Sequence, residues 1–573
     1  MVSPSRFSLL SRFSCAQPVK LSIHRNLHTI TKKQPIHHLG SRFSSSTANN
    51  QSRSSLLYGL VCGILAGGAT YFTTRYIQNR SLSRQFAVGN ASVDHSPFEP
   101  VFATSKVYPK FIKELKKVLG EDSVSIDADE LERHGSSSWS SYHYVHNPNV
   151  VVYPTSTEQV SAIVKLCHKH RVPVIPFSGG TSLEGHFSAT YGGICVDFMN
   201  MDKVLEVHDA DLDCIVQPAV KWEDLNDQLQ SKGLFFGPDP GPGAEIGGMV
   251  GTGCSGTNAA RYGTMRENVL SITAVLADGT IVKTRRRPRK SSAGYDLTHL
   301  FIGSEGTLGL VTEITLKLHA IPPCRNVAVC QFESIHDAAT TVQNIMRQGL
   351  NVAAMELLDD TQMRIINEAL TSHWEEKPTL FFKFAGGYKA VQETIDIVGK
   401  LARKNHGGKF QFARNETEAE SLWNARKQAL WSTLAFAKED LQVWTTDVCV
   451  PLSRLPDLIT KTQKDLKDAG LLGGIVSHAG DGNFHSFLLY DKNKPEEFEK
   501  ASTLVHRLVL NAIHMDGTIT GEHGIGLVKR AYLNEELSPD TVALMRQLKC
   551  ALDPLGILNP GHVLPQPGES VSH

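Results

Sequence analysis

The chain has 573 residues, with 58 Lys and Arg against 58 Asp and Glu, 41% hydrophobic residues and 46 Gly. This composition excludes a disordered chain and a small disulfide-stapled domain, and it leaves room for two or three large lobes. The zero net charge is unevenly distributed: no acidic residue precedes Asp94, whereas eleven Lys and Arg do, which leaves 47 basic and 58 acidic residues for the rest. The part that folds is therefore acidic, which argues against a nucleic-acid-binding protein.

Residues 1–55 are rich in Ser and Arg and contain no acid. Spaced arginines among small and apolar residues are typical of a mitochondrial presequence, so we exclude this segment from the fold. A disordered basic tail is the alternative interpretation.

Residues 56–74 follow as a possible membrane anchor. Seventeen uncharged residues run from Leu56 to Phe72 between Arg53 and Arg75. Seventeen residues are the lower limit for a helix that spans a bilayer, and a cleaved part of the presequence is the alternative. The sequence thus predicts a mitochondrial protein at the inner membrane, with a polar linker over residues 75–105.

From residue 106 the pattern alternates between strands and helices, which predicts an α+β fold. Residues 149–154 and 173–176 are expected to be strands on either side of a helix over 157–170, and further strands are expected over 193–199, 213–218, 271–276 and 309–318. Pro322 and Pro323 close this first lobe, so we assign residues 106–323 to it and 324–565 to a second α+β lobe.

Four glycine-rich turns fall in the first lobe, and they lie within residues 176–186, 237–248, 251–268 and 303–309. Consecutive backbone N–H groups in such turns hold phosphate oxygens. Turn chemistry alone explains any one of them, but four with neighbouring hydroxyls favour a long diphosphate cofactor. Residues 251–256 formally fit G-x-G-x-x-G, yet no clean strand precedes them and Asp278-Gly279 is typical of a hairpin turn, so we reject a nicotinamide site.

Three segments carry a specific resemblance: PFSGGTSLEGH, DPGPGAEIGGMVGTGCSGTNAARYGTMRENV and GYDLTHLFIGSEGTLGLVTEITL. They resemble the FAD-binding lobe of the flavoprotein family typified by vanillyl-alcohol oxidase and p-cresol methylhydroxylase. Over residues 100–565 the chain is most similar to the family's D-2-hydroxyacid dehydrogenases of mitochondria that use cytochrome c. The resemblance implies an FAD-binding lobe of two subdomains, a C-terminal α+β cap domain of the FAD-linked oxidase type, and oxidation of D-lactate to pyruvate.

The resemblance also implies which residues of the first lobe contact FAD. They are Pro176, Ser178, Gly179, Gly180, Thr181, Ser182, Gly185, Pro240, Gly247, Gly248, Thr252, Ser255, Asn258, Glu305, Gly306 and Leu308, joined by Asn559 from the C-terminal segment. Within this set, Glu305, Gly306 and Leu308 are expected on the adenine side. Some relatives link FAD covalently, and His186 and Cys254 are the nearest candidates, but this subgroup generally binds FAD without a link.

The second lobe contains HAGDGNFH, residues 478–485, and TGEHGIG, residues 520–526. His478 and His485 converge if strand, turn and strand fold back, and Glu522 adds an oxygen ligand suited to Zn, Mn or Fe. The alternative is that they are ordinary loop histidines. The resemblance implies that His478, His485 and Glu522 bind a divalent metal, Zn or Mn, and that His523 is the general base.

Arg426 lies in WNARKQALW, a predicted helix in which aromatic neighbours would fix its side chain. Its planar fork suits a substrate carboxylate, whereas a solvent-exposed Arg is the default for any helix. The resemblance to the family implies that Arg426 binds the substrate carboxylate. It also implies that His523 takes the hydroxyl proton while hydride passes from C2 to the flavin.

The substrate class leaves alternatives. Relatives that oxidise D-2-hydroxyglutarate have an additional Lys and Asn that bind the second carboxylate. An ungapped comparison with them places Thr445 or its neighbours and Phe487 at the corresponding positions of this chain. A small monocarboxylate such as D-lactate fits better, and glycolate differs from it by one methyl group. A non-catalytic flavin-binding subunit and an alkylglycerone-phosphate synthase are the competing function classes.

Overall fold

The computed structural model describes residues 100–137, 140–142, 144–437, 440–566, 568–569 and 571. The predicted presequence, the predicted anchor and most of the predicted linker lie outside these residues. Among the helices that are described, none combines the length and the apolar character needed to cross a bilayer.

The first lobe begins with a four-stranded sheet in the order β1-β2-β4-β3, formed by β1 (Val124–Ser125), β2 (Val150–Val152), β3 (Val174–Phe177) and β4 (Ile194–Asp197). Strands β2, β3 and β4 are parallel, as a βαβ crossover requires. The crossover helix is α4 (Thr157–His170), which Ser156 caps by accepting a hydrogen bond from Gln159 N–H. This helix and its two flanking strands are where the sequence predicts them.

A second sheet has the order β5-β6-β10-β8-β9 and is antiparallel throughout. Its strands are β5 (Val204–His208), β6 (Asp213–Val216), β8 (Val269–Val275), β9 (Ile281–Lys283) and β10 (Leu310–Lys317). Asp278 and Gly279 turn the chain between β8 and β9, which confirms the predicted hairpin. Gly251 lies inside helix α6 (Ile246–Thr252), so no strand leads into residues 251–256, in agreement with the rejection of a nicotinamide site.

The first lobe also contains further helices and one two-stranded pair. The remaining elements are α2 (Tyr108–Leu119), α3 (Ala128–Arg133), α5 (Trp222–Gln230), α7 (Ala259–Tyr262), α8 (Met265–Asn268), α9 (Leu297–Phe301) and the pair β7 (Leu234–Phe235) and β11 (His319–Ala320).

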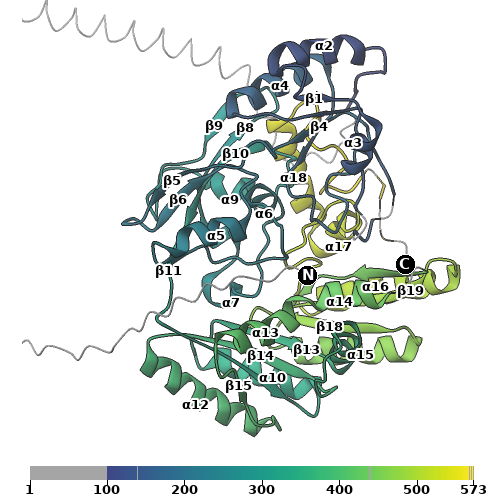
Figure 1. Cartoon of the computed structure of the whole chain (residues 1–573). Helices are drawn as coiled ribbons and strands as arrows, with labels where there is room; N and C mark the ends of the chain where they lie inside the picture. Colours follow the sequence, from purple (N-terminus) through teal and green to yellow (C-terminus); the bar gives the residue numbers. More distant parts are fainter. Residues whose placement is uncertain are drawn as a thin grey trace, which may run out of the picture. The chain divides into compact units, whose positions relative to one another are not determined.

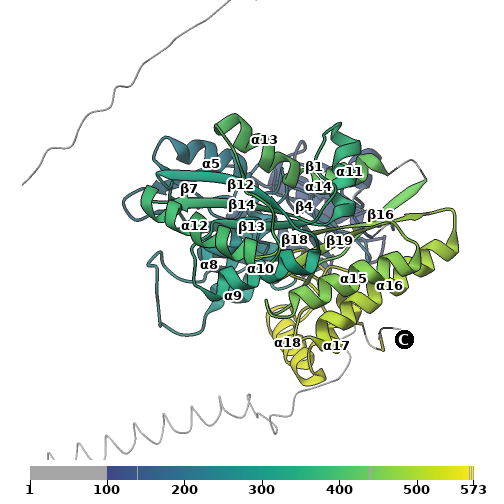
Figure 2. The ribbon, with the colours of Figure 1, turned by 90° about the horizontal axis from the view of Figure 1, so that it is seen from below.

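The second lobe is built on an eight-stranded sheet with the order β15-β12-β14-β13-β18-β19-β16, in which β17 also pairs with β19. The strands are β12 (Cys324–Gln331), β13 (Ala354–Leu358), β14 (Thr379–Gly386), β15 (Gln411–Phe412), β16 (Leu441–Thr445), β17 (Val448–Cys449), β18 (Gly473–His478) and β19 (Asn483–Asp491). Helices α10 (Ile335–Arg347), α12 (Tyr388–Lys404), α15 (Leu455–Ala469) and α16 (Pro495–His514) cover the face that points away from the first lobe (Figure 2). The opposite face packs on α11 (Asp360–Leu370), α13 (Glu416–Lys427) and α14 (Ala429–Phe436).

The C-terminal segment returns to the first lobe. After η1 (Arg530–Tyr532), α17 (Leu533–Glu536) and α18 (Pro539–Leu552), the backbone of Leu558 pairs in parallel with Val174 of β3. Ile557 and Leu558 are buried in the same core as β2 and β4, and Figure 1 shows the yellow C-terminal helices beside the purple and teal lobe. The predicted second lobe, residues 324–565, therefore includes a final stretch that completes the first.

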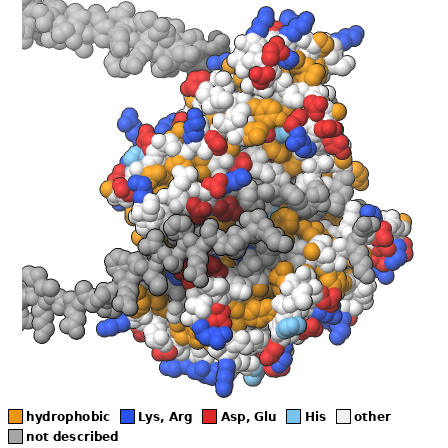
Figure 3. Space-filling model, viewed as in Figure 1, with side chains coloured by type: hydrophobic (Ala, Val, Ile, Leu, Met, Phe, Trp, Pro, Cys, Tyr) orange, Lys and Arg blue, Asp and Glu red, His pale blue; other side chains and the backbone are white. Residues whose placement is uncertain are grey.

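On the face drawn in Figure 3, acidic and basic side chains are interspersed over both lobes rather than gathered by sign. Among the described cysteines, all eight are free and five are buried. The fold is thus held by its apolar cores, not by disulfides.

Candidate functional site

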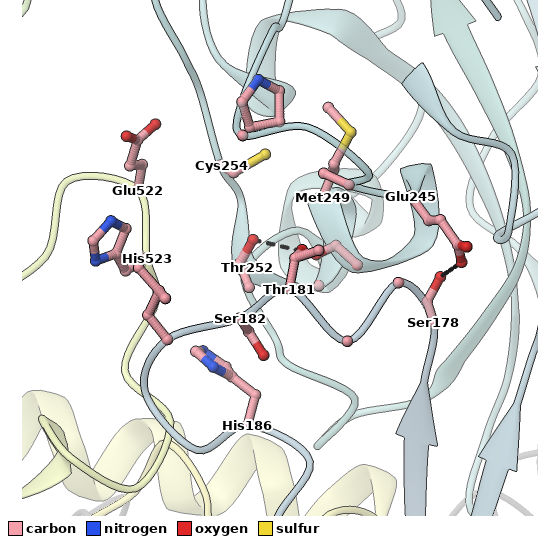
Figure 4. Close-up of a pocket in the computed structure, with 18 of the residues that line it drawn as sticks. Ser178, Thr181, Ser182, His186, Glu245, Met249, Thr252, Cys254, Glu522 and His523 are labelled. Atoms are coloured by element: carbon pink, nitrogen blue, oxygen red, sulfur yellow. Dashed lines mark hydrogen bonds between the residues drawn. The ribbon is translucent and has the colours of Figure 1, made fainter. Parts of the chain in front are cut away.

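A cavity of about 390 Å³ lies where the two lobes meet, a size typical of small-molecule sites. Its walls come from the glycine loops of the first lobe and from the second-lobe segments that carry Arg426, His478, His485, Glu522 and His523. Figure 4 shows the residues of this cavity from Ser178 and Glu245 at one end to Glu522 and His523 at the other. Both groups of predicted site residues therefore face one space.

Most of the residues predicted to contact FAD line this cavity. They are Pro176, Ser178, Gly179, Gly180, Thr181, Ser182, Pro240, Gly247, Gly248, Thr252, Glu305, Gly306 and Asn559. Gly185, Ser255, Asn258 and Leu308 are not part of its wall. Ser255 and Asn258 instead use their polar groups within the protein: Ser255 Oγ donates to Glu522 at 2.7 Å and Asn258 Nδ2 donates to Gly237 O at 3.1 Å.

The glycine-lined end fits a dinucleotide. A Cβ atom added to Gly248 or Gly251 would point into open space in the cavity wall, so the backbone there is accessible to a ligand. Gly180 has φ +63°, a conformation that glycine adopts without strain. Beside these turns, Ser178 Oγ donates to Glu245 at 2.6 Å, and burial raises the pKa of Glu245 to about 6. Exposed backbone and hydroxyl groups are the donors that a diphosphate needs.

The two candidate covalent attachment residues also face the cavity. The ring nitrogens of His186 are buried and have no hydrogen-bond partner, although Nε2 lies 3.4 Å from a Glu305 carboxylate oxygen. Burial raises the pKa of the Cys254 thiol well above its usual value, and the carboxylate of Glu522 adds to the effect, so this sulfur is a poor nucleophile at neutral pH. The geometry thus gives no activated thiol for a link to a cofactor.

His478 and His485 converge because of strand register. β18 pairs antiparallel with β19 so that Val476 lies opposite His485, and alternation places the side chains of both histidines on the sheet face that is turned to the cavity. Their ring centroids are 5.4 Å apart and nearly perpendicular. The strand, turn and strand predicted from the sequence is confirmed.

Glu522 completes this cluster from the loop of residues 520–526. Its Oε1 lies 2.9 Å from His478 Nε2 and 3.2 Å from His485 Nε2. The three ligand atoms form a group able to hold a metal ion. Burial alone would raise the pKa of Glu522, but His478 and His485 outweigh it and lower the pKa well below its usual value, which keeps the carboxylate ionised.

The second nitrogen of each imidazole has its own partner. His485 Nδ1 lies 3.0 Å from the carbonyl oxygen of Thr446, to which it can only donate, so Nε2 is left as the acceptor. His478 Nδ1 lies 3.1 Å from Glu356 Oε1. A carboxylate or carbonyl behind each imidazole is the arrangement that orients histidines at metal sites. Both the donor set and its supports therefore fit a divalent ion.

His523 lies beside the cluster rather than within it. Its ring stacks on His485 at 4.8 Å with an interplanar angle of 7°, and its Nδ1 is 3.4 Å from Glu184 Oε1. Burial alone would lower the pKa of His523, but Asp447 and Glu184 raise it above its ordinary value. A second potential metal group, formed by Asp447, His485 and His523, shares His485 with the first.

Arg426 is buried in the cavity wall on α13, not exposed to solvent. Its Nη2 lies 2.5 Å from Glu356 Oε2, and its Nε has no hydrogen-bond partner. Part of the guanidinium is therefore held by the protein, while the buried Nε remains available as a donor. A buried N–H of a cationic group that has no partner of its own suits the capture of an anion.

Four buried charged residues of this region were missed from the sequence: Glu184, Glu356, Asp447 and Lys529. Lys529 Nζ pairs with Glu184 Oε1 at 2.8 Å, and Asp447 lies between these groups and His485. The sequence does contain a signal for Glu356, which is an acidic residue inside the apolar strand AMELL. Acidic residues are rarely buried without a partner, so this pattern indicates a buried interaction. Lys427 was also missed; it lines the cavity with its Nζ 5.1 Å from the ring centroid of Trp222.

Known proteins match both lobes. A family model described as FAD binding domain matches residues 148–285, and one described as FAD linked oxidases, C-terminal domain, matches residues 321–563. A mitochondrial D-lactate dehydrogenase (cytochrome) from Kluyveromyces lactis is 46% identical over 526 residues, which cover 89% of this chain and 90% of the relative. The Arabidopsis thaliana protein of the same name is 44% identical over 509 residues, 87% of this chain and 89% of its own.

Among solved structures, p-cresol methylhydroxylase with substrate bound has a TM-score of 0.68 at 17% identity, over 80% of this chain and 97% of that one. At this identity the likeness speaks for the fold alone. It confirms the predicted α+β architecture, and the two family models identify the first lobe as FAD-binding and the second as the C-terminal domain of FAD-linked oxidases.

Proposed function

The chain belongs to the family of mitochondrial D-lactate dehydrogenases that use cytochrome, and from this premise we propose that it oxidises D-lactate to pyruvate with FAD and passes the electrons to cytochrome c. One observation carries the proposal: a single cavity joins backbone turns suited to a dinucleotide with two imidazoles, a carboxylate, a further histidine and a buried arginine.

FAD held by the glycine loops supplies the hydride acceptor, and a divalent ion, Zn or Mn, held by His478, His485 and Glu522 supplies Lewis acidity at the substrate oxygens. The fit of the residues supports both groups. Backbone turns open onto the cavity at one end, and the donor atoms of the three ligands lie within 4.8 Å of one another at the other.

Arg426 binds the substrate carboxylate in this proposal. Its guanidinium is already oriented by Glu356, so little side-chain freedom is lost when the substrate arrives. Fixing the carboxylate also fixes the position of C2 and its hydroxyl group relative to the other groups of the cavity.

His523 takes the hydroxyl proton at Nε2, because Nδ1 is turned toward Glu184. The C2 hydrogen leaves with its electron pair as the hydroxyl group becomes a carbonyl, so one proton and one hydride convert lactate to pyruvate. Glu184 and Asp447 stabilise the imidazolium that results, since both carboxylates raise the pKa of His523 against the effect of burial.

The cavity wall beside these groups supports a small substrate. Thr445 and Phe487 line the cavity together with Val476 and Leu430. By the ungapped comparison above, Thr445 or its neighbours and Phe487 occupy the places where D-2-hydroxyglutarate dehydrogenases add a Lys and an Asn. An apolar wall accepts the methyl group of lactate but offers no partner to a second carboxylate. Lys427 also lines the cavity, but its amine lies against Trp222 of the first lobe.

The relatives are named as mitochondrial, and the acid-free, Arg-rich first 93 residues suit import into that organelle. We further propose attachment to the inner membrane through residues 56–74. Carbonate extraction of mitochondria tests this point: a full chain that is released into the supernatant contradicts the anchor.

The function is tested by mixing the purified holoenzyme anaerobically with D-lactate, L-lactate, glycolate or D-2-hydroxyglutarate and following the flavin absorbance. Rapid bleaching by D-lactate, followed by reoxidation with cytochrome c, is the expected result. Faster bleaching by D-2-hydroxyglutarate would contradict the argument from the apolar wall, and no bleaching by any acid would contradict the proposed activity.

A further inference from the structure

The loop of residues 520–526 carries two of the proposed active groups, Glu522 and His523, yet it has no regular secondary structure of its own. A loop without helix or strand hydrogen bonds must satisfy its buried N–H groups elsewhere. Two buried carboxylates accept most of them, and they come from distant parts of the chain.

Asp447 holds the beginning of the loop. Its Oδ2 accepts hydrogen bonds from the backbone N–H groups of Gly521 at 2.9 Å, Glu522 at 3.0 Å and His523 at 2.8 Å, and from Thr520 Oγ at 2.7 Å. Asp447 follows β16 in the second lobe and is fully buried.

Glu305 holds the end of the loop. Its Oε1 accepts from Ile525 N–H at 2.6 Å and its Oε2 from Gly526 N–H at 2.8 Å. The contact is close: a Cβ atom on Gly524 would come within 2.7 Å of Glu305 Oε1. Glu305 belongs to the first lobe, so this carboxylate joins the cofactor-binding lobe to the loop that carries Glu522 and His523.

The backbone of Glu305 is held in an uncommon conformation. Its φ is +51°, a left-handed value that a non-glycine residue adopts only where its surroundings impose it. Its N–H donates to Gly251 O at 2.9 Å, and its carbonyl accepts from Asn559 Nδ2 at 2.8 Å. These neighbours hold the backbone of Glu305 in place while its carboxylate accepts from the loop amides, and Oε2 also lies 3.4 Å from His186 Nε2.

We propose that Glu305 and Asp447 are positioning residues: their carboxylates hold the loop of residues 520–526 in place by hydrogen bonds from the two lobes. Glu305 thereby positions Glu522 and His523 and does not bind the adenine side of FAD. The inference rests on the proposed function of those two residues. Glu305 lines the cavity, but both oxygens of its carboxylate already accept hydrogen bonds from loop amides. A shift of the loop by about 1 Å is enough to lower turnover about 100-fold.

Glu305→Gln tests the proposal because it keeps the side-chain length and the backbone conformation but replaces one acceptor oxygen with a donor. Glu313→Gln is the matched control, since Glu313 is another carboxylate of the first lobe, bonded to Thr273 Oγ1 at 3.0 Å and remote from the loop. The measurements on each holoenzyme are FAD content, affinity for Mn²⁺ after chelator treatment, and the rate of flavin reduction over a range of D-lactate concentrations.

For Glu305→Gln we expect FAD content equal to the wild type, Mn²⁺ binding weakened about 10-fold or more, and a maximal rate of flavin reduction lowered about 10-fold or more. KM should change little, because Arg426 is on α13 and not on this loop. Glu313→Gln should match the wild type. Loss of FAD in proportion to the loss of activity would place Glu305 on the cofactor and overturn the proposal, as would wild-type Mn²⁺ affinity and rate.

Hydrogen exchange on the wild type provides a measurement that needs no variant to fold. The backbone amides of residues 519–528 should be protected from exchange although the loop is irregular. Exchange at the rate of an unstructured peptide would contradict the proposal that the two carboxylates hold this loop. If wild-type flavin is not reduced by any hydroxy acid, the proposed function fails. The Mn²⁺ affinities of wild type and Glu305→Gln would still test the positioning role.

Discussion

The carboxylate of Glu356 contacts two functional side chains: Nδ1 of His478 and Nη2 of Arg426. Its own position follows from register, because β13 pairs with β18 so that Glu356 lies opposite His478. It therefore links the proposed metal ligands to the proposed anion clamp.

We expect Glu356→Gln to weaken divalent-metal binding about 10- to 100-fold, since the carboxylate behind a ligating histidine sets its orientation and basicity. KM for D-lactate should rise as well, because Arg426 loses the group that orients it. Metal retained after graded chelator dialysis and initial rates measure the two effects. Glu333→Gln, on the surface beside Lys377, is the control; unchanged metal retention in Glu356→Gln would contradict the linkage.

His523→Ala tests the base at the same scale. Loss of a positioned general base costs about 10²- to 10⁴-fold in rate, whereas His523 lies across the cavity from Ser178 and Glu245 (Figure 4). Anaerobic flavin bleaching by D-lactate should become slower by that factor, with FAD content unchanged. Equal bleaching rates in the variant and the wild type would eliminate the base assignment; His336→Ala, half-exposed on α10, should retain full activity.

At the scale of elements, the turn between β18 and β19 sets the distance between His478 and His485. Gly482 occupies this turn with φ +82°, and a Cβ atom there would come within 2.1 Å of Val450 O. Both the left-handed conformation and the lack of space require glycine.

Gly482→Ala should therefore move the turn and reduce metal retention, together with a loss of stability of about 1–3 kcal/mol. Gly470→Ala is a matched control because Gly470 also has a positive φ, +68°, at the end of α15, but a Cβ atom at this position would meet no other atom within 4 Å. That control should lose about 1 kcal/mol of stability and keep its metal. Equal metal loss in both variants would show that the turn does not control the site.

Sequence patterns were sufficient where the signal was local. α4 begins at the predicted cap, and the two histidines converge through a strand, turn and strand contained in nineteen residues. Glu356 and Asp447 could not be assigned in this way, because their contacts with His478 and with residues 520–526 depend on pairing between strands far apart in the sequence. The resemblance placed Glu305 at the cofactor cavity, but only the three-dimensional structure shows where its carboxylate points.

At the scale of the whole molecule, the C-terminal segment ties the end of the chain to the first lobe. Leu558 pairs with Val174 of β3 and is fully buried in the same core as β2 and β4, and the side-chain amide of the next residue, Asn559, donates to His186 O and Glu305 O. Leu558→Ala should lower the free energy of unfolding by about 2–5 kcal/mol. It should also weaken FAD retention, because the neighbouring Asn559, which holds the carbonyls of His186 and Glu305, loses packing. Leu548→Ala, at an exposed position of α18, should change neither the thermal midpoint nor FAD content; a similar loss in both variants would contradict a specific tie.

A half-buried histidine of the first lobe, His319, should make the stability of the molecule sensitive to acid. His319 lies on β11 between Phe235 and Tyr262, and its Nε2 is 2.8 Å from Asn268 Oδ1. Burial lowers the pKa of His319 to about 4, and the cations of Lys317, Arg289 and Arg261 add to this effect.

Between pH 6.5 and 4 the unfolded chain therefore binds a proton at His319 that the folded protein does not, so the free energy of unfolding must fall as the pH is lowered through this range. The partial exposure of the ring reduces the size of the effect. His319→Gln keeps a donor for Asn268 but cannot titrate, so its thermal midpoint should fall less than that of the wild type between about pH 7 and about pH 4.5. Parallel curves for the two proteins would mean that the acid sensitivity arises elsewhere, whereas convergence at low pH would place it at His319.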